Sequence, residues 1–228
     1  MKKFLALLLI ILLFLPNLAF AEDALQVVDS NIFIVGKNYG LYFAKVENKS
    51  DKPVLYEDGV LDMLDEKGNI VSSDKYIMPR QYHGIINPGE YAYIKTTLSG
   101  DSANVNLKTQ LNIKSRESKN EYAVFESETT FKYASPYGNN YIYATFTNTS
   151  DKTLYGIGCS AALYDADGKI IFCDDKWILE IGVHPNTSTT VRFDIHSSLL
   201  DYFKENNIVP VKADAVIRYA IKDDNIIY

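Results

Sequence analysis

The sequence predicts an all-β protein in which two antiparallel β-sandwich domains lie in tandem behind an N-terminal signal peptide. The first observation is an internal repeat: eight residues of the segment 44–70 recur 100 positions later, where chance would give about two. The second is a series of short β-rich segments, separated by turn residues at intervals of about 8–12 residues, which is typical of sandwiches. The recurring residues are Ala44, Asn48, Ser50, Asp51, Lys52, Asp65, Gly68 and Ile70, each with an identical counterpart in the segment 144–170.

The N-terminus has the pattern of a secretory signal. Lys2 and Lys3 precede an unbroken apolar run over residues 4–15, and residues 19–21 offer a small-x-small cleavage site. Because this run is short for a membrane span, we expect cleavage after Ala21 rather than a retained anchor. The prediction for residues 1–21 is therefore a removed signal, which gives a secreted or cell-surface protein without stable membrane insertion.

The first domain is predicted over residues 22–123, and its strands follow from alternation and from the turns between them. Residues 41–46 alternate and then meet a polar cluster at 48–53. Turns at 65–68 and 87–90 separate the later strands, because both contain glycine beside polar residues. The expected strands are 25–28, 32–35, 41–46, 54–64, 69–71, 74–78, 91–98 and 105–113.

The second domain, predicted over residues 124–228, repeats this order. Its turn at 165–168 matches that at 65–68, and only the segment 199–206 is typical of a helix. The boundary between the domains is predicted near residues 114–124, where residues 114–121 are polar and lack periodicity, which is compatible with either a stiff or a flexible linker. The expected strands are 129–133, 141–146, 154–164, 175–179, 189–195 and 209–221.

The two cysteines, Cys159 and Cys173, both fall in the second repeat. In an exported protein such a pair is commonly oxidised. If the chain folds back about Ala166, Cys159 lies opposite Cys173 in an antiparallel pair, within disulfide reach. The prediction is a disulfide between these residues, and the alternative is two buried free thiols.

The charge balance excludes some classes of partner. The chain has 23 basic and 29 acidic residues, for a formal net charge of −6, and the predicted signal contains two of the lysines and no acid. An acidic chain is a poor match for nucleic acid or for anionic lipid surfaces. We therefore expect no nucleic-acid partner, and the simplest role of the charge is solubility.

Few motifs in the sequence are typical of metal or catalytic sites, and each of them can be explained by a structural role alone. Asp165-x-Asp167-Gly168 resembles the start of a calcium loop, but the later oxygen ligands are missing and the first repeat has Lys67 at the matching place. A turn capped by aspartate explains both copies. The three histidines have no zinc-site spacing, and no nucleophile-elbow motif is present. We expect no metal, no cofactor and no catalytic residue.

Tyrosine is the compositional anomaly, with 17 residues. Tyrosines in strands usually pack their rings across a sheet and leave the hydroxyl in water. The alternative is an exposed aromatic surface that contacts protein or glycan. For such a surface the sequence favours the loop 76–83, with Tyr76, Arg80 and Tyr82. Trp177, which aligns with Tyr76, is expected to be an anchor common to both domains.

The turn and core motifs also carry a family resemblance. The run Asn148-x-Ser150-Asp151-Lys152, followed by Leu163-Tyr164-Asp165-x-Asp167-Gly168-Lys169, a proline turn and a Thr/Val strand, resembles the FxLYD family of bacterial extracytoplasmic domains. The aromatic residue of that name is replaced by Ala161 here and by Leu61 in the first repeat. The resemblance implies two tandem immunoglobulin-like sandwiches and no shared catalytic residue.

The function expected from these observations is an exported, non-catalytic binding module whose partner is an unknown protein or glycan at the cell envelope. Loops at the ends of a rigid sandwich would supply the specificity. The alternative is a structural spacer or chaperone-like envelope component that offers an edge strand to partners. An unrecognised hydrolase is the third hypothesis, and nothing in the sequence favours it.

Overall fold

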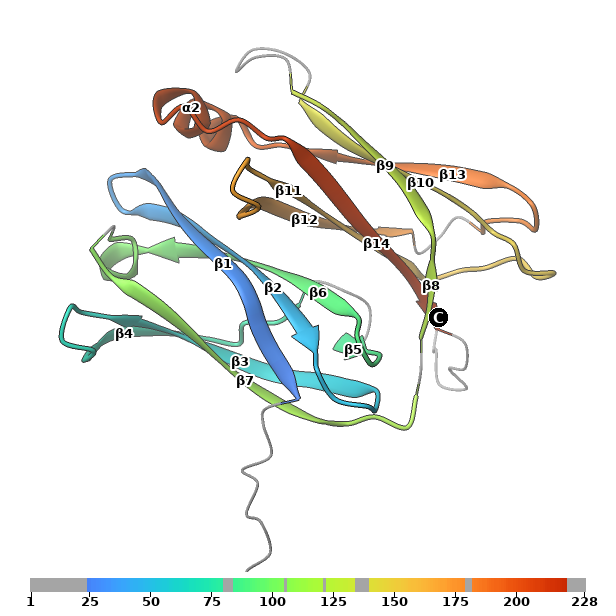
Figure 1. Cartoon of the computed structure of the whole chain (residues 1–228), viewed down its shortest axis with the longest axis horizontal. Helices are drawn as coiled ribbons and strands as arrows, with labels where there is room; N and C mark the ends of the chain where they lie inside the picture. Colours follow the sequence, from blue (N-terminus) through green and yellow to red (C-terminus); the bar gives the residue numbers. More distant parts are fainter. Residues whose placement is uncertain are drawn as a thin grey trace, which may run out of the picture.

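Antiparallel strands dominate the computed structural model, which confirms the predicted all-β sandwich fold (Figure 1). Among the described residues, no helix has the length and apolar character needed to cross a membrane. The structure describes residues 24–79, 84–104, 106–120, 122–133, 140–178 and 182–220.

The first half of the chain forms two sheets. One contains the strands β1 (Leu25–Gly36), β2 (Tyr39–Asn48) and β6 (Tyr91–Ser99), in the order β1-β2-β6. In the other, β3 (Val54–Leu64) pairs with β4 (Ile70–Lys75), β5 (Ile85–Ile86) and β7 (Lys108–Glu117). A single 3-10 turn, η2 (Gly100–Ser102), follows β6.

The second half repeats this plan. One sheet has the order β13-β10-β9, with β9 (Ser127–Lys132), β10 (Tyr141–Thr147) and β13 (Ser188–Asp194). The other has the order β12-β11-β14-β8, with β8 (Tyr122–Phe125), β11 (Ile157–Tyr164), β12 (Ile170–Ile178) and β14 (Lys212–Ala220). The helix α2 (Ser197–Glu205) lies where the sequence predicted one.

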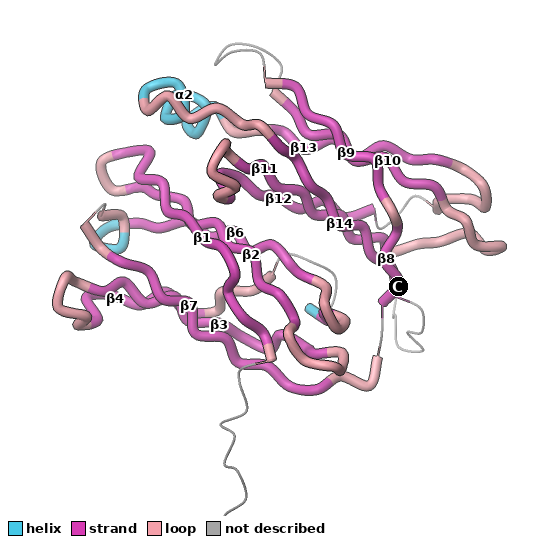
Figure 2. The backbone as a smooth tube through the Cα atoms, in the orientation of Figure 1, coloured by secondary structure: helices cyan, strands magenta, loops and turns pink. Residues whose placement is uncertain are grey.

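The four sheets are stacked as layers (Figure 2). The sheet β1-β2-β6 and the sheet β12-β11-β14-β8 are the inner layers and pack against each other. This position explains a difference between strands: all eight residues of β11 are buried, whereas β7 alternates between exposed and half-buried residues. A strand that is covered on both faces loses the alternation expected of a strand with one wet face.

The apolar interior has two parts. One cluster belongs to the first half alone and includes Tyr42, Val46, Leu61 and Ile94. The other contains the core of the second half and also includes four residues of the first half. It therefore extends across the contact between the two halves, which we call the joint. These four are Phe33, Leu41, Phe43 and Tyr93.

In the duplicated Asn-x-Ser-Asp-Lys motif, the asparagine side chain is buried and forms several hydrogen bonds. The amide Nδ2 of Asn148 donates to the carbonyl oxygens of Lys152 (2.7 Å) and Val183 (2.8 Å). Its Oδ1 accepts from the Ser150 backbone N–H (2.9 Å) and from the Ser150 hydroxyl (2.7 Å). Asn48 makes the same bonds in the first half, and both asparagines are fully buried. The motif therefore ties a loop to the strand behind it, which explains why both copies keep it.

The Asp-x-x-Gly segments form the predicted capped turns. The Asp165 Oδ1 accepts hydrogen bonds from the backbone N–H of Asp167 (3.0 Å) and of Lys169 (2.9 Å). Gly168 has a φ of 76° and Gly68 a φ of 84°, a conformation that favours glycine. The aspartate of this motif thus stabilises its own turn.

The strand ladders fix the alignment of the two copies. Val60 faces Lys75 in the first half, and Ser160 faces Asp175 in the second, so β3–β4 and β11–β12 correspond at a displacement of 100. The sequence alignment of Trp177 with Tyr76, at a displacement of 101, is therefore wrong. The sequence suggests the wrong alignment because an Asp-Lys dipeptide precedes both residues. It lies at 74–75 in the first copy but one position further along, at 175–176, in the second.

The predicted disulfide is wrong, and the register gives the reason. Both cysteines are free and buried. A bulge beside the turn shifts the β11–β12 pairing, so Cys159 faces Lys176, and Cys173 faces Ala162. Residues directly opposite each other share a face of the sheet, and neighbours along a strand alternate. Cys159 and Cys173 therefore lie on opposite faces of their sheet, where no bridge can form.

Candidate functional site: the joint and the groove beside it

Aromatic side chains from both halves meet in the joint. The rings of Phe43 and Phe172 have centroids 6.0 Å apart. Phe33 packs edge-on against two residues of α2, with centroid distances of 5.5 Å to Tyr202 and 5.8 Å to Phe203. Such aromatic pairs add to the stabilisation that comes from burying apolar area. The helix α2 therefore stabilises the end of the first half as well as the end of the second half, to which it belongs.

A tyrosine cluster lies in the same joint and is bound to one carboxylate. The Tyr91 and Tyr93 hydroxyls donate to Oδ2 of Asp214, at 2.6 Å and 2.9 Å. The Tyr93 and Tyr164 hydroxyls are 2.9 Å apart. The expectation that strand tyrosines keep their hydroxyls in water is wrong for these residues. The second half supplies Asp214 and Tyr164, and their hydrogen bonds satisfy polar groups that burial would otherwise penalise.

Burial raises the pKa of these tyrosines, and this makes the fold sensitive to alkali. Desolvation raises the pKa of Tyr91, Tyr93 and Tyr164 in the joint, and that of Tyr42 to about 12 in the first core. Unfolded tyrosine has a pKa of about 10. The folded state therefore keeps protons that the unfolded state loses, and the stabilisation is complete below pH 10 and declines above it.

We expect the free energy of unfolding to fall as the pH rises from about 10 towards 12, by up to about 1.4 kcal/mol per pH unit for each such tyrosine. Urea unfolding at a series of pH values measures the slope. Tyr93→Phe, which cannot ionise, should make the slope shallower, whereas Tyr39→Phe at an exposed position should not. An unchanged slope in Tyr93→Phe would contradict the assignment.

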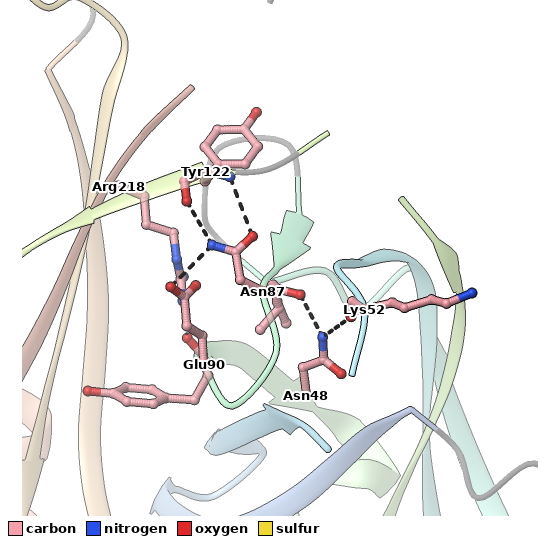
Figure 3. Close-up of polar contacts among 8 residues, drawn as sticks. Asn48, Lys52, Asn87, Glu90, Tyr122 and Arg218 are labelled. Atoms are coloured by element: carbon pink, nitrogen blue, oxygen red, sulfur yellow. Dashed lines mark hydrogen bonds and ion pairs between the residues drawn. The ribbon is translucent and has the colours of Figure 1, made fainter. Parts of the chain in front are cut away.

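An arginine closes the opposite end of the joint. The Arg218 guanidinium on β14 donates to the Tyr91 carbonyl oxygen and lies 3.6 Å from Glu90 Oε2, and its side chain is 4% exposed (Figure 3). In the same view, the Asn87 amide donates to the Tyr122 carbonyl oxygen at 2.7 Å and to Glu90 Oε1 at 3.2 Å. The turn before β6 is therefore bonded both to the start of β8 and to β14.

The edge strand β12 is covered by the first half. Asp29 Oδ2 accepts the Ile170 backbone N–H at 2.7 Å, and Asp29 Oδ1 lies 3.3 Å from the Lys169 ammonium. Further along the strand, Lys95 Nζ is 3.0 Å from Asp174 Oδ1. An edge strand exposes unpaired backbone groups that invite aggregation. Here Asp29 satisfies one of them and fixes the register between the halves.

The Cys173 thiol belongs to this contact. It donates to the Ile94 carbonyl oxygen at 3.2 Å and is fully enclosed. Desolvation raises the pKa of Cys173, and it raises that of Cys159 to about 12. Because the thiolate is the reactive form, both cysteines pack as small apolar groups.

An open groove of about 580 Å³ lies beside the tyrosine cluster. Its walls come from both halves: β1 and β2 on one side, and the 165–169 turn and the start of β14 on the other. The Tyr164 ring and two exposed valines supply its apolar surface. The charged lining residues are Asp29, Lys45, Asp165, Asp167, Lys169 and Lys212.

The carboxylates and the lysines of this groove differ in their hydrogen bonds and ion pairs with the rest of the protein. Asp29 and Asp165 accept backbone hydrogen bonds. In contrast, Lys45 Nζ lies 3.7 Å from the centre of the Tyr91 ring, and Lys212 Nζ lies 5.6 Å from that of Tyr164, and neither lysine forms an ion pair with a described residue. Desolvation lowers the pKa of Lys45. The groove therefore offers two ammonium groups to a ligand.

The residues that the sequence favoured for binding are not brought into one described site. Tyr76 is 81% exposed and has a φ of 62°, just beyond β4. Trp177, on β12 in the other half, is 44% exposed and has its indole N–H 3.1 Å from Asp175 Oδ2. Arg80 and Tyr82 lie outside the described residues. The groove residues Lys45 and Lys212 were missed, because nothing local in the sequence shows that distant strands meet.

In the described part of the chain, no three His, Cys, Asp or Glu side chains are grouped so that they could hold a metal ion. The fold and the joint define an all-β chain with two sandwiches stacked face to face. No protein-family model and no curated protein matches it. Among solved structures, the crystal structure of red sea bream transglutaminase is similar over 87% of this chain, with 12% identity and a TM-score of 0.24. The match spans 29% of the transglutaminase chain, and a likeness this distant carries no argument.

Proposed function

We propose that the protein is an exported, non-catalytic binding module of the cell envelope, and that the groove between its halves binds the anionic groups of a glycan. The observation that carries the proposal is the pair Lys45 and Lys212, two lysines without ion-pair partners among the described residues, on facing walls of one groove. The lining contains as many aspartates as lysines, but Asp29 and Asp165 already accept backbone hydrogen bonds, so these two ammonium groups favour an anionic ligand.

The geometry suits a sugar chain better than an isolated ion. An open groove of this volume holds a few sugar units, and the Tyr164 ring in its wall offers a face for a sugar to pack on. Two walls from separate halves that are locked by buried contacts would keep the ammonium groups at a fixed spacing. A pre-organised site loses less conformational entropy when a ligand binds.

Removing the two ammonium groups should weaken binding. Isothermal titration of a short oligogalacturonate, with the neutral oligosaccharide of equal length as the comparison, measures the affinity. We expect the acidic sugar to bind more tightly and binding to weaken with salt. Lys45→Gln and Lys212→Gln should each weaken it about tenfold, a difference of about 1.4 kcal/mol.

Lys67→Gln is the matched control, because Lys67 is exposed on a turn that does not line the groove. Equal affinity of the two lysine variants and the control would place any binding elsewhere. Binding of an acidic peptide but not of oligogalacturonate would contradict the glycan as ligand.

A structural role is the second candidate, and a specific observation favours it. The two sandwiches are joined by aromatic packing, hydrogen bonds and ion pairs on a broad face, rather than by the linker alone. Such a unit transmits force and keeps a fixed length, as an envelope spacer would require.

A further inference from the structure

The two halves meet through different sheets, so the joint is heterologous. The first half contributes β1-β2-β6, and the second contributes β12-β11-β14-β8. In the internal repeat, the sheet β9-β10-β13 corresponds to β1-β2-β6, and the sheet β4-β3-β7 corresponds to β12-β11-β14. The sheets β9-β10-β13 and β4-β3-β7 are the outermost layers of the stack (Figure 1). Each end of the molecule therefore presents the counterpart of a surface that is already used inside it.

The outer edge strand β4 exposes apolar residues that its copy buries. Ile70 is 62% exposed and Val71 is 51% exposed. Their counterparts on β12, Ile170 and Ile171, are 0% and 1% exposed, and Asp29 of the first half binds the Ile170 backbone N–H. Two neighbouring aliphatic side chains on an uncovered edge strand are typical of an interaction surface.

A carboxylate on the same strand lacks the partner that its copy has. Asp174 on β12 is 3.0 Å from Lys95 across the joint. Asp74 occupies the equivalent place on β4, since it faces Leu61 as Asp174 faces Ala161. The Asp74 Oδ2 is buried and has no hydrogen-bond partner among the described residues. Buried polar atoms are rarely left in this state, and because this one is enclosed within its own chain, the half-buried Asp74 side chain must turn outward to meet a partner.

The outer face of the second half presents matching groups. Tyr141 and Tyr143 stand where the first half has Leu41 and Phe43, and their rings are 5.9 Å apart. They leave part of their surface open to solvent.

Charged groups on that face also match those of the joint. Arg192 faces Tyr143 as Lys95 faces Phe43, and Glu128 faces Thr145 as Asp29 faces Lys45. The Arg192 guanidinium lies 4.4 Å from the centre of the Tyr141 ring and 3.1 Å from Asp194, and its side chain is 53% exposed. Arg192 and Glu128 therefore offer the cation and the acceptor that the joint obtains from Lys95 and Asp29.

We propose that copies of this chain associate head to tail, with the β4 edge of one copy docked on the β9-β10-β13 face of the next. Arg192 of one copy pairs with Asp74 of the other, and Glu128 accepts the Ile70 backbone N–H as Asp29 accepts that of Ile170. The two tyrosines cover Ile70 and Val71. Because the contact is heterologous and leaves both ends open, it produces a linear stack rather than a closed dimer.

The contact between copies is weaker than the joint within the chain. Ser72 stands where the joint has Phe172, and Gln110 stands where it has Asp214. Association should therefore depend on concentration and be favoured where the protein is crowded.

Sedimentation of residues 22–228, which contain every described element, tests the proposal. Across protein concentrations from about 1 μM to about 1 mM, the average mass should rise beyond that of a dimer without a plateau at two copies. Ile70→Glu and Arg192→Glu should each abolish the rise. Val209→Glu, at a site that is 58% exposed and outside β4, β9, β10 and β13, should not.

Mixing separates this arrangement from a two-fold dimer. Ile70→Glu blocks one end of the molecule and Arg192→Glu the other, so neither variant associates alone, but an equimolar mixture should form a dimer of one copy of each. A wild-type protein that stays monomeric, a mass that stops at two copies, or a mixture that forms no dimer would each overturn the proposal. Unchanged melting temperatures in both variants exclude misfolding as the cause. The glycan titration is independent, because it changes none of these residues.

Discussion

Replacing Arg218 by alanine is expected to destabilise the protein by about 3–5 kcal/mol, the range found when one partner of a buried ion pair is removed. The Arg218 side chain is 4% exposed and lies 3.6 Å from Glu90. Without it, Glu90 keeps a partly desolvated charge, and the Tyr91 carbonyl oxygen loses its donor. The cavity left by the long side chain adds to the loss.

Thermal and urea unfolding measure this effect. A loss of this size should lower the melting temperature by about 6–20 °C in a chain of this length. Arg116→Ala is the matched control, because Arg116 also pairs with a glutamate, at 2.7 Å, but its side chain is 61% exposed. We expect that control to change stability by less than about 1 kcal/mol. Equal losses in the two variants would show that burial of Arg218 does not decide its contribution.

Asn148→Ala is expected to cost about 3 kcal/mol or more. The variant removes four hydrogen bonds at a fully buried position, and the Lys152 and Val183 carbonyl oxygens each lose one of their two donors. Each hydrogen bond lost costs about 0.5–1.5 kcal/mol.

The repeat provides an internal test of this expectation. Asn48→Ala should cause a loss of similar size, because Asn48 makes the same four bonds. Asn69→Ala is the control, since the exposed Asn69 side chain bonds only to Asp65, and it should cost less than about 1 kcal/mol. Urea unfolding gives all three values. A small effect of Asn148→Ala alone would mean that the second loop is held by other contacts.

Local chemistry was read correctly where the interaction partners are close in sequence. The strand 54–64 follows from alternation, and the turns at 65–68 and 165–168 follow from glycine φ and from capping by nearby aspartate. The helix near residue 200 follows from the spacing of its apolar residues. Asn48 and Asn148 were recognised as turn residues through their repetition. Their bonds to distant strands, to Ile86 and Val183, could not be predicted.

The arrangement of the two cysteines could not be predicted from local sequence. The predicted pairing depended on the exact residue at which the chain turns, and a bulge beside Tyr164 displaced the register and put the thiols on opposite faces. The exposure of tyrosine hydroxyls was misjudged for a related reason, because Asp214 reaches them from the other half.

The duplication, the antiparallel strands of both copies and the places of their turns can all be predicted from the residues alone, because strands and turns arise from contacts over a few residues. Which sheet of each half is covered follows only from how the halves pack together. That choice explains differences between the copies: Asp62 and Ser73 are hydrogen-bonded to each other on the outer layer, whereas their counterparts Ala162 and Cys173 are buried on an inner one. Burial of a surface depends on everything that packs against it, and residues about 100 positions away supply that packing here.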